Sequence, residues 1–315
     1  MRRPAVGLVV CLAVTASLYA PHVRGAAFVY EDLNDINTTY RPWQGLAVEA
    51  HDLVVKPARA LTSAVDRLVG FDPQRQHLVS LGLHLFAGVL VYLVALAVLP
   101  EPSALIAAAV FLLAPWQVEA VAYAAARSDV LVTLAVLLGV LAIETDRFWL
   151  AGLCAVAAVL AKESGIVAWL LLPAWAMWRG QTWPLGWILG WALVAWAGAT
   201  VALTTRDLGA HLTWPPVVDG LQALGGLLLT PPWGFSVDPA RAALWPILAV
   251  GGVAVVAWWR SPHWTALVVG GVLLAWAPRL LVATAETPKY HHLYLPLAIL
   301  SLGVGRLVVP ADYCG

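Results

Sequence analysis

Two adjacent carboxylates, Glu31 and Asp32, follow the aromatic run Phe28 to Tyr30, just beyond the first apolar segment of the chain. Like charges this close disfavour full ionisation of both groups, so one carboxyl holds a proton more readily than an isolated acid does. Such a pair suits the general base that activates a hydroxyl nucleophile. The alternative is a solvated start of a loop, in which both acids face water. We name Asp32 and Glu31 as candidate catalytic residues.

Two basic positions suit a phosphate group. The guanidinium fork of Arg41, beside Pro42, matches the geometry of a phosphate. Lys162 and Glu163 stand between two apolar runs, where charged side chains are costly unless they are paired or reach the polar surface. We expect Lys162 to contact a lipid phosphate or pyrophosphate. The alternative is a helix-turn cap formed with Ser164.

A third polar segment has helical spacing. At about 100° per residue, Trp116, Glu119, Tyr123 and Arg127 fall on one narrow stripe of a helix. A polar stripe at a membrane boundary must face protein or a watery cavity. We therefore expect Glu119 and Arg127 to line a substrate site. The alternative, of equal weight, is a structural network that holds two helices together.

Four of the eight histidines bear on a possible site. His77 and His84 are seven residues apart and share a helix face. His77 stands at the membrane boundary, where it can reach a substrate, whereas the deeper His84 fits a packed, hydrogen-bonded histidine. His291 and His292 point about 100° apart on a helix, which is a poor metal clamp. We expect no resident metal, although a divalent ion held by carboxylates stays open.

The composition places most of the chain in lipid. Of its 315 residues, 61% are hydrophobic and 11% are charged, against about 25% charged residues in a typical soluble domain. So few charges cannot cover a water-facing surface of this size. The 18 basic and 18 acidic residues balance, which argues against a nucleic-acid partner.

Apolar runs predict an all-α polytopic membrane protein with about ten transmembrane helices, within a range of nine to twelve. One transmembrane domain covers 1–309, and 310–315 form a short tail. The first run also fits a cleavable signal peptide, but we expect it to be retained as a helix. The expected spans lie near 5–21, 78–99, 103–117, 129–143, 147–161, 164–178, 184–203, 241–259, 264–282 and 293–309.

Arg2 and Arg3 place the start of the first span on the cytoplasmic side by the positive-inside rule. Residues 22–77 and 204–240 then form two long loops outside, and the first of them includes an amphipathic helix lying on the membrane. Basic residues are nevertheless more numerous outside than inside, mainly because of the first loop. We expect an integral, multi-pass protein of a bacterial plasma membrane, with its polar face extracytoplasmic.

The order of these segments resembles a known family. A carboxylate pair after an aromatic, an Arg-Pro, a boundary His, a Pro-x-x-x-Glu with Arg-Ser-Asp, a Lys-Glu and a Leu-Tyr-Leu-Pro follow one another from Phe28 to Pro296. This order resembles the polyprenyl-phosphate-sugar-dependent glycosyltransferases of the GT-C superfold. Most similar are the O-mannosyltransferase-like membrane proteins that often carry tetratricopeptide repeats. This chain has no such repeats, and it has Ala114 and His291 where the family commonly has His and Arg.

The resemblance implies a transferase that moves a mannose-like sugar from a polyprenyl-phosphate donor to a hydroxyl of a protein or glycan acceptor. The catalytic base would be Asp32 or Glu31, and no resident cofactor is implied. The residues that would bind the donor phosphate or shape its site are Arg41, His77, Glu119, Arg127, Lys162, Glu163 and His291.

Two other classes of protein stay open. A transporter or flippase of a polar lipid would place ionisable groups near the bilayer midplane, and the deep candidates are few: His84 and Arg279. The other class is an inactive scaffold of the same fold, which only an activity assay distinguishes from the enzyme.

Overall fold

The computed structural model describes residues 4–25, 72–123, 126–182, 261–281 and 293–307. Within these ranges the chain is helical and has no strand, so the predicted all-α class is confirmed for them. The α-helices are α1 (Pro4–Arg24), α5 (Pro73–Leu96), α6 (Glu101–Leu113), α7 (Val118–Ala122), α8 (Arg127–Glu144), α9 (Phe148–Ala161), α10 (Ala168–Trp178), α15 (Pro262–Leu281) and α16 (Tyr294–Leu307).

Prolines set several helix boundaries. Pro73 opens α5 directly after Asp72, at a position where its missing N–H leaves no bond unmade. Pro115 ends α6, because it cannot donate to the preceding turn. After it the chain continues through the 3-10 helix η1 (Pro115–Gln117) into α7, bent by 50° from α6.

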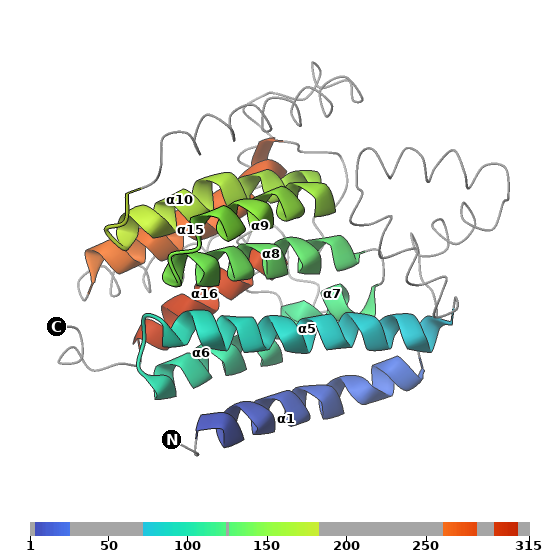
Figure 1. Cartoon of the computed structure of the whole chain (residues 1–315). Coiled ribbons are helices and arrows are strands. Elements are labelled where there is room, and N and C mark those ends of the chain that lie inside the picture. Colours follow the sequence, from blue (N-terminus) through green and yellow to red (C-terminus); the bar gives the residue numbers. More distant parts are fainter. Residues whose placement is uncertain (1–3, 26–71, 124–125, 183–260, 282–292, 308–315) are drawn as a thin grey trace, which may run out of the picture.

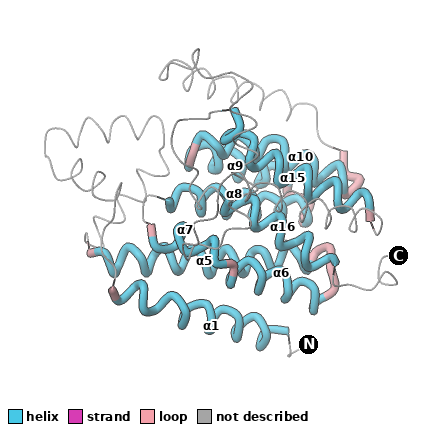
Figure 2. Tube along the Cα trace, turned by 180° about the vertical axis from the view of Figure 1, so that it is seen from behind, coloured by secondary structure: helices cyan, strands magenta, loops and turns pink. Residues whose placement is uncertain are grey.

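The helices pack side by side as the chain crosses the bundle back and forth (Figure 1). Seen from both sides, α1 lies at one edge, and α9, α10 and α15 lie at the opposite edge (Figure 2). Between them, α5 packs on α6 and α8, and α16 packs on α6 and α15. This alternation brings the start of α5, the start of α8 and the end of α9 to the same end of the bundle (Figure 1).

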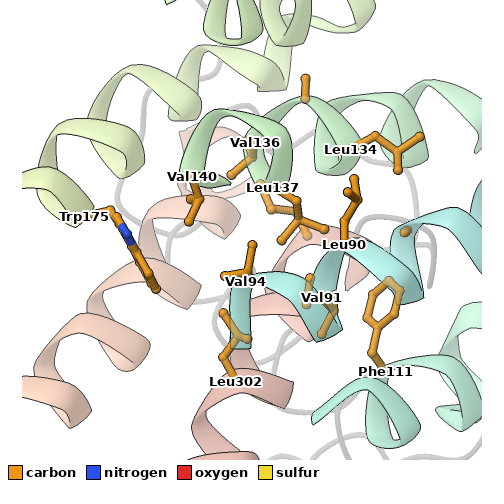
Figure 3. Packing of buried hydrophobic residues seen from close by; sticks show 14 of the residues in the cluster. Leu90, Val91, Val94, Phe111, Leu134, Val136, Leu137, Val140, Trp175 and Leu302 are labelled. Carbon is orange, nitrogen blue, oxygen red and sulfur yellow. The ribbon is translucent and has the colours of Figure 1, made fainter. Parts of the chain in front are cut away.

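The core is built from aliphatic side chains of α5, α6, α8 and α16. One buried cluster contains Leu90, Val91 and Val94 of α5 together with Leu137 of α8 and Leu302 of α16 (Figure 3). Such interdigitated packing excludes voids, and for this reason the positions tolerate little change in volume.

Helices occupy eight of the ten predicted spans, but the prediction of about ten membrane crossings is wrong for the described residues. Among the described helices, only α1 and α5 are long and apolar enough to cross, with a third crossing if α6 and the bent segment Pro115–Ala122 count as one span. Helix α8 carries three charges, and α9, α10 and α16 have 14, 11 and 14 residues. At about 1.5 Å per residue these are short of the ~30 Å hydrocarbon core. The predicted spans at 184–203 and 241–259 lie outside the described residues.

Two to three helices of this kind indicate a membrane protein. The outer helix α1 supports this, since Val6, Val9 and Leu18 are each 60% exposed and present an apolar face to the surroundings. In water such a face is unfavourable, whereas lipid solvates it.

Candidate functional site

One end of the bundle gathers polar groups from four helices. Gln74 Nε2, at the start of α5, donates to the carbonyl of Arg24, at the end of α1, over 3.0 Å. The start of α8 and the residue that follows α9 lie at the same end (Figure 1). We call this the polar end and define it by Arg24, His77, Arg127, Asp129 and Lys162. The chain therefore leaves α1 and enters α5 at this end, on either side of the segment 26–71.

His77 is buried, and both of its ring nitrogens face backbone carbonyls. Nδ1 lies 2.6 Å from the oxygen of Pro73, and Nε2 lies 2.7 Å from the oxygen of Ala122. Ala122 is the last residue of α7, where carbonyls have no partner within the helix. His77 therefore fastens α7 to α5. Its ring can touch a substrate only by giving up one of these contacts.

Arg127 is buried at the first position of α8. Its Nη2 donates to the carbonyl of Gln76 over 3.3 Å, so the guanidinium lies against the first turns of α5. The bond joins α8 to α5 immediately beside His77. His77 and Arg127, each predicted as a site residue, thus lie at neighbouring positions along α5.

The prediction that Trp116, Glu119, Tyr123 and Arg127 lie on one stripe of a single helix is wrong. Helix α7 ends at Ala122, Tyr123 has an extended backbone, and α8 begins at Arg127. Glu119 is half-buried on α7, and Arg127 belongs to a different helix. The two residues still lie at the same end of the bundle, because α7 packs against both α5 and α8.

Lys162 follows α9 and forms a nearly buried ion pair with Asp129. Its Nζ lies 2.9 Å and 2.8 Å from the two carboxylate oxygens, and the side chains are 15% and 11% exposed. Asp129 belongs to the first turn of α8, so the pair joins α8 to α9. A phosphate that binds Lys162 must share it with Asp129.

Sequence reasoning did not include Asp129 among the site residues. The signal was present, because a lysine between two apolar runs requires a partner. Choosing that partner needs the antiparallel packing of α8 on α9. Glu163 opens the 3-10 helix η3 (Glu163–Val167) directly after the ion pair. The predicted residues Glu31, Asp32, Arg41 and His291 lie outside the described residues.

The prediction that His84 is a packed, hydrogen-bonded histidine is confirmed. Its Nδ1 lies 2.7 Å from the hydroxyl of Tyr294, and its Nε2 lies 3.2 Å from the carbonyl of Leu112. The rings of Tyr19 and Phe111 pack against the imidazole in tilted orientations, at centroid distances of 5.6 and 5.5 Å. A carbonyl only accepts, so Nε2 carries the hydrogen and Nδ1 accepts from the tyrosine. A neutral imidazole satisfies both contacts.

Two buried polar side chains, one at the bend and one on α5, have no hydrogen-bond partner among the described residues. They are Gln117, at the end of η1, and Ser80, which lies on α5 between the two histidines. Buried groups of this kind lower stability unless something binds them. Gln117 lies at the break between α6 and α7, where a broken membrane helix exposes polar groups to the protein interior.

The opposite end of the bundle has its own polar cluster. Arg179 Nε lies 3.1 Å from Glu144 Oε1, which also accepts a hydrogen bond from the indole of Trp175 over 2.7 Å. The Arg179 guanidinium stands 5.8 Å from the centroid of the Trp178 ring. Tryptophan and arginine together are typical of a membrane–water interface.

Comparisons with protein-family models, with curated proteins and with solved structures found no match. In the parts of the chain that are described, no group of three or more His, Cys, Asp or Glu is placed to hold a metal ion.

Proposed function

We propose that the protein is a membrane glycosyltransferase that uses a polyprenyl-phosphate sugar. The observation that carries the proposal is the convergence of His77, Arg127 and Lys162 at the polar end, in a chain with membrane-crossing helices. Three basic groups beside apolar helices suit a substrate that joins a phosphate to a lipid tail.

The segment of the sequence that contains the candidate base joins the described bundle at the same end. Glu31, Asp32 and Arg41 belong to the segment 26–71, which connects the end of α1 to the start of α5, and these two helix ends meet at the polar end. This connectivity supports a shared site, because the chain both leaves and re-enters the described bundle beside His77 and Arg127.

The proposed reaction is a single displacement. Asp32 removes the proton from an acceptor hydroxyl, and the oxygen attacks the anomeric carbon of the sugar. The bond from that carbon to the phosphate oxygen breaks, and its electron pair leaves with the lipid phosphate. Basic side chains stabilise the negative charge that grows on the leaving group. The acceptor is a protein or a glycan on the extracytoplasmic face of a bacterial plasma membrane.

The bend between α6 and α7 favours a second candidate, a transporter or flippase of a polar lipid. Broken helices that carry buried polar groups without a hydrogen-bond partner, here Gln117, are a feature of transporter sites. A flippase moves a lipid-linked sugar intact from one leaflet to the other, whereas a transferase releases the sugar from the lipid.

The experiment is sugar transfer in membranes that contain the full chain and a radiolabelled polyprenyl-phosphate mannose. Asp32→Asn is expected to lower transfer about a hundredfold, the scale of a lost general base. Glu31→Gln is made separately to decide which acid is the base. The matched control is Asp146→Asn, an exposed acid that follows α8 at the opposite end and is expected to keep wild-type transfer.

Two results would each contradict a different part of the proposal: the identity of the base, or the class of protein. Full transfer by both Asp32→Asn and Glu31→Gln would remove the assigned base. Movement of intact labelled lipid between leaflets, with no release of sugar by the wild type, would replace the transferase by the flippase.

A further inference from the structure

Gln117 ends the 3-10 helix η1 at the bend between α6 and α7, and its side chain is 0% exposed. Within the part of the chain that is described, neither its amide oxygen nor its amide nitrogen has a hydrogen-bond partner. An amide carries both donor hydrogens and an acceptor oxygen, so bonds of both kinds are unmade. Burial of such groups is costly, and the cost is removed when a bound group supplies the missing bonds.

Ser80 of α5 is a second buried side chain whose hydroxyl is unbonded among the described residues. The carbonyl that a helical serine can use one turn earlier, here that of Gln76, accepts a hydrogen bond from Arg127 Nη2. Ser301 of α16 is also buried, and its hydroxyl donates to the carbonyl of Ala298 in its own helix over 2.7 Å. Burial in a helix therefore does not by itself leave a serine of this protein without a bond.

Gln117 and Ser80 belong to segments that pack on each other. Val118, which follows Gln117, and Leu81, which follows Ser80, lie in one apolar cluster with Tyr19 of α1. Helix α7 also packs directly on α5. The unbonded amide and the unbonded hydroxyl are thus carried by neighbouring parts of the bundle.

We propose that Gln117, together with Ser80, binds hydroxyl groups of the sugar on the lipid donor; the identity of this ligand rests on the proposed function. An amide both donates and accepts hydrogen bonds, so a ligand that satisfies it must do both as well. The phosphate of the donor only accepts, and it would leave the amide oxygen of Gln117 without a bond. A sugar hydroxyl donates and accepts, and it needs no charge from its partner.

The distance from the bend to the polar end suits a sugar that is joined to a phosphate. The five residues of α7 separate Gln117 from the polar end, where His77 contacts the carbonyl of Ala122. At 1.5 Å per residue they span roughly 7.5 Å along the helix axis, which is comparable with the width of one sugar ring. A phosphate bound at the polar end therefore has its sugar within reach of the bend.

The sugar reaches Gln117 through a shift of η1, because the amide is fully covered by its neighbours. Pro115 has no N–H with which to bond the preceding turn of α6, so it does not tie η1 to that helix. A short 3-10 segment within a helical span often marks a hinge. The bonds that the sugar makes to the amide offset the cost of burying it, and so favour the sugar-bound arrangement.

The first test is the stability of variants that remove the unbonded groups. Gln117→Met keeps the length of the side chain without its polar atoms, and Ser80→Ala removes only the hydroxyl. We expect both to keep or raise the unfolding midpoint of the purified full chain, since neither loses a bond. The matched control, Ser301→Ala, loses a bond and is expected to unfold about 2–4 °C below Ser80→Ala. A clearly lower midpoint for Gln117→Met would show that its amide is bonded inside the protein, and would overturn the proposal.

The second test compares the binding of polyprenyl-phosphate mannose with that of bare polyprenyl phosphate. We expect Gln117→Met to bind the mannosyl lipid about tenfold more weakly than wild type does, the scale of one hydrogen bond. Binding of the bare phosphate is expected to stay within about twofold, because the amide does not contact the phosphate. Mannosyl lipids that each lack one hydroxyl identify the bonded group: wild type binds one of them about tenfold more weakly, and Gln117→Met does not discriminate against it.

The outcomes separate this sugar site from the proposed function. Equal binding of the mannosyl lipid by wild type and a folded Gln117→Met overturns the sugar site and leaves the transferase standing. If Gln117→Met does not fold, wild type decides, because equal binding of the mannosyl lipid and of every deoxy analogue also overturns the site. Sugar-dependent binding that is lost in Gln117→Met, without any transfer by the wild type, contradicts the transferase and leaves the sugar site standing.

Discussion

Lys162→Met is expected to lower the free energy of unfolding by about 3–5 kcal/mol, the cost of leaving one member of a buried ion pair without its partner. Asp129 would keep a carboxylate that is 11% exposed and has lost the ammonium group now within 2.9 Å of both its oxygens. Whole domains are stable by only about 5–15 kcal/mol, so this loss is a large part of the total. The measurement is thermal or denaturant unfolding of the purified protein in detergent.

The matched control for the ion pair is the double variant Lys162→Met with Asp129→Leu. Replacing both members of the pair by apolar groups of similar size avoids burying either charge without the other, so stability is expected to return to within about 1–2 kcal/mol of wild type. The double-mutant cycle then isolates the interaction. A single variant Lys162→Met as stable as wild type would show that the pair does not fasten α8 to α9.

Gly165→Ala is expected to lower the free energy of unfolding by about 3 kcal/mol, the upper part of the range for overpacked positions. A Cβ at Gly165 would overlap the carbonyl group of Ala158 and lie 2.8 Å from the backbone nitrogen of Val159. These are backbone atoms in the last turns of α9, so no side chain can rotate away. The 3-10 helix η3 would be pushed off α9, together with the segment that carries Lys162.

The matched control for Gly165 is Gly82→Ala, on the exposed side of α5. A Cβ at Gly82 has nothing within 4 Å, and alanine is the better helix former, so stability is expected to be unchanged or higher by up to about 1 kcal/mol. Unfolding midpoints of the two variants give the comparison. Equal midpoints for Gly165→Ala and wild type would mean that η3 does not pack on α9 as described.

The helical class of the fold was predictable, and the number of crossings was not. Apolar runs of 14 to 24 residues identify helices at 73–96 and 148–161. In lipid a single segment must satisfy its own backbone hydrogen bonds, and a helix does so. The length of a run does not show where the helix inside it stops. Pro115 divides one predicted span, and the 3-10 helix at Glu163–Val167 shortens another.

The candidate site was predictable in its residue types but not in its pairings. The position of Lys162 between apolar runs requires a partner, and the fold identifies that partner as Asp129. The stripe from Trp116 to Arg127 failed, because helical spacing assumes an unbroken helix and Tyr123 is extended. The role of His77 depends on where α7 ends, which is a matter of tertiary packing that no local pattern contains.

The most direct test of the central claim, a lipid-phosphate site at the polar end, is photocrosslinking with a photoactivatable polyprenyl phosphate in membranes, followed by mapping of the modified peptides. We predict adducts on the peptides that contain His77, Arg127 and Lys162, and their loss when excess unlabelled polyprenyl phosphate competes. Adducts confined to the opposite end, on the peptides that contain Glu144 and Arg179, would contradict the account.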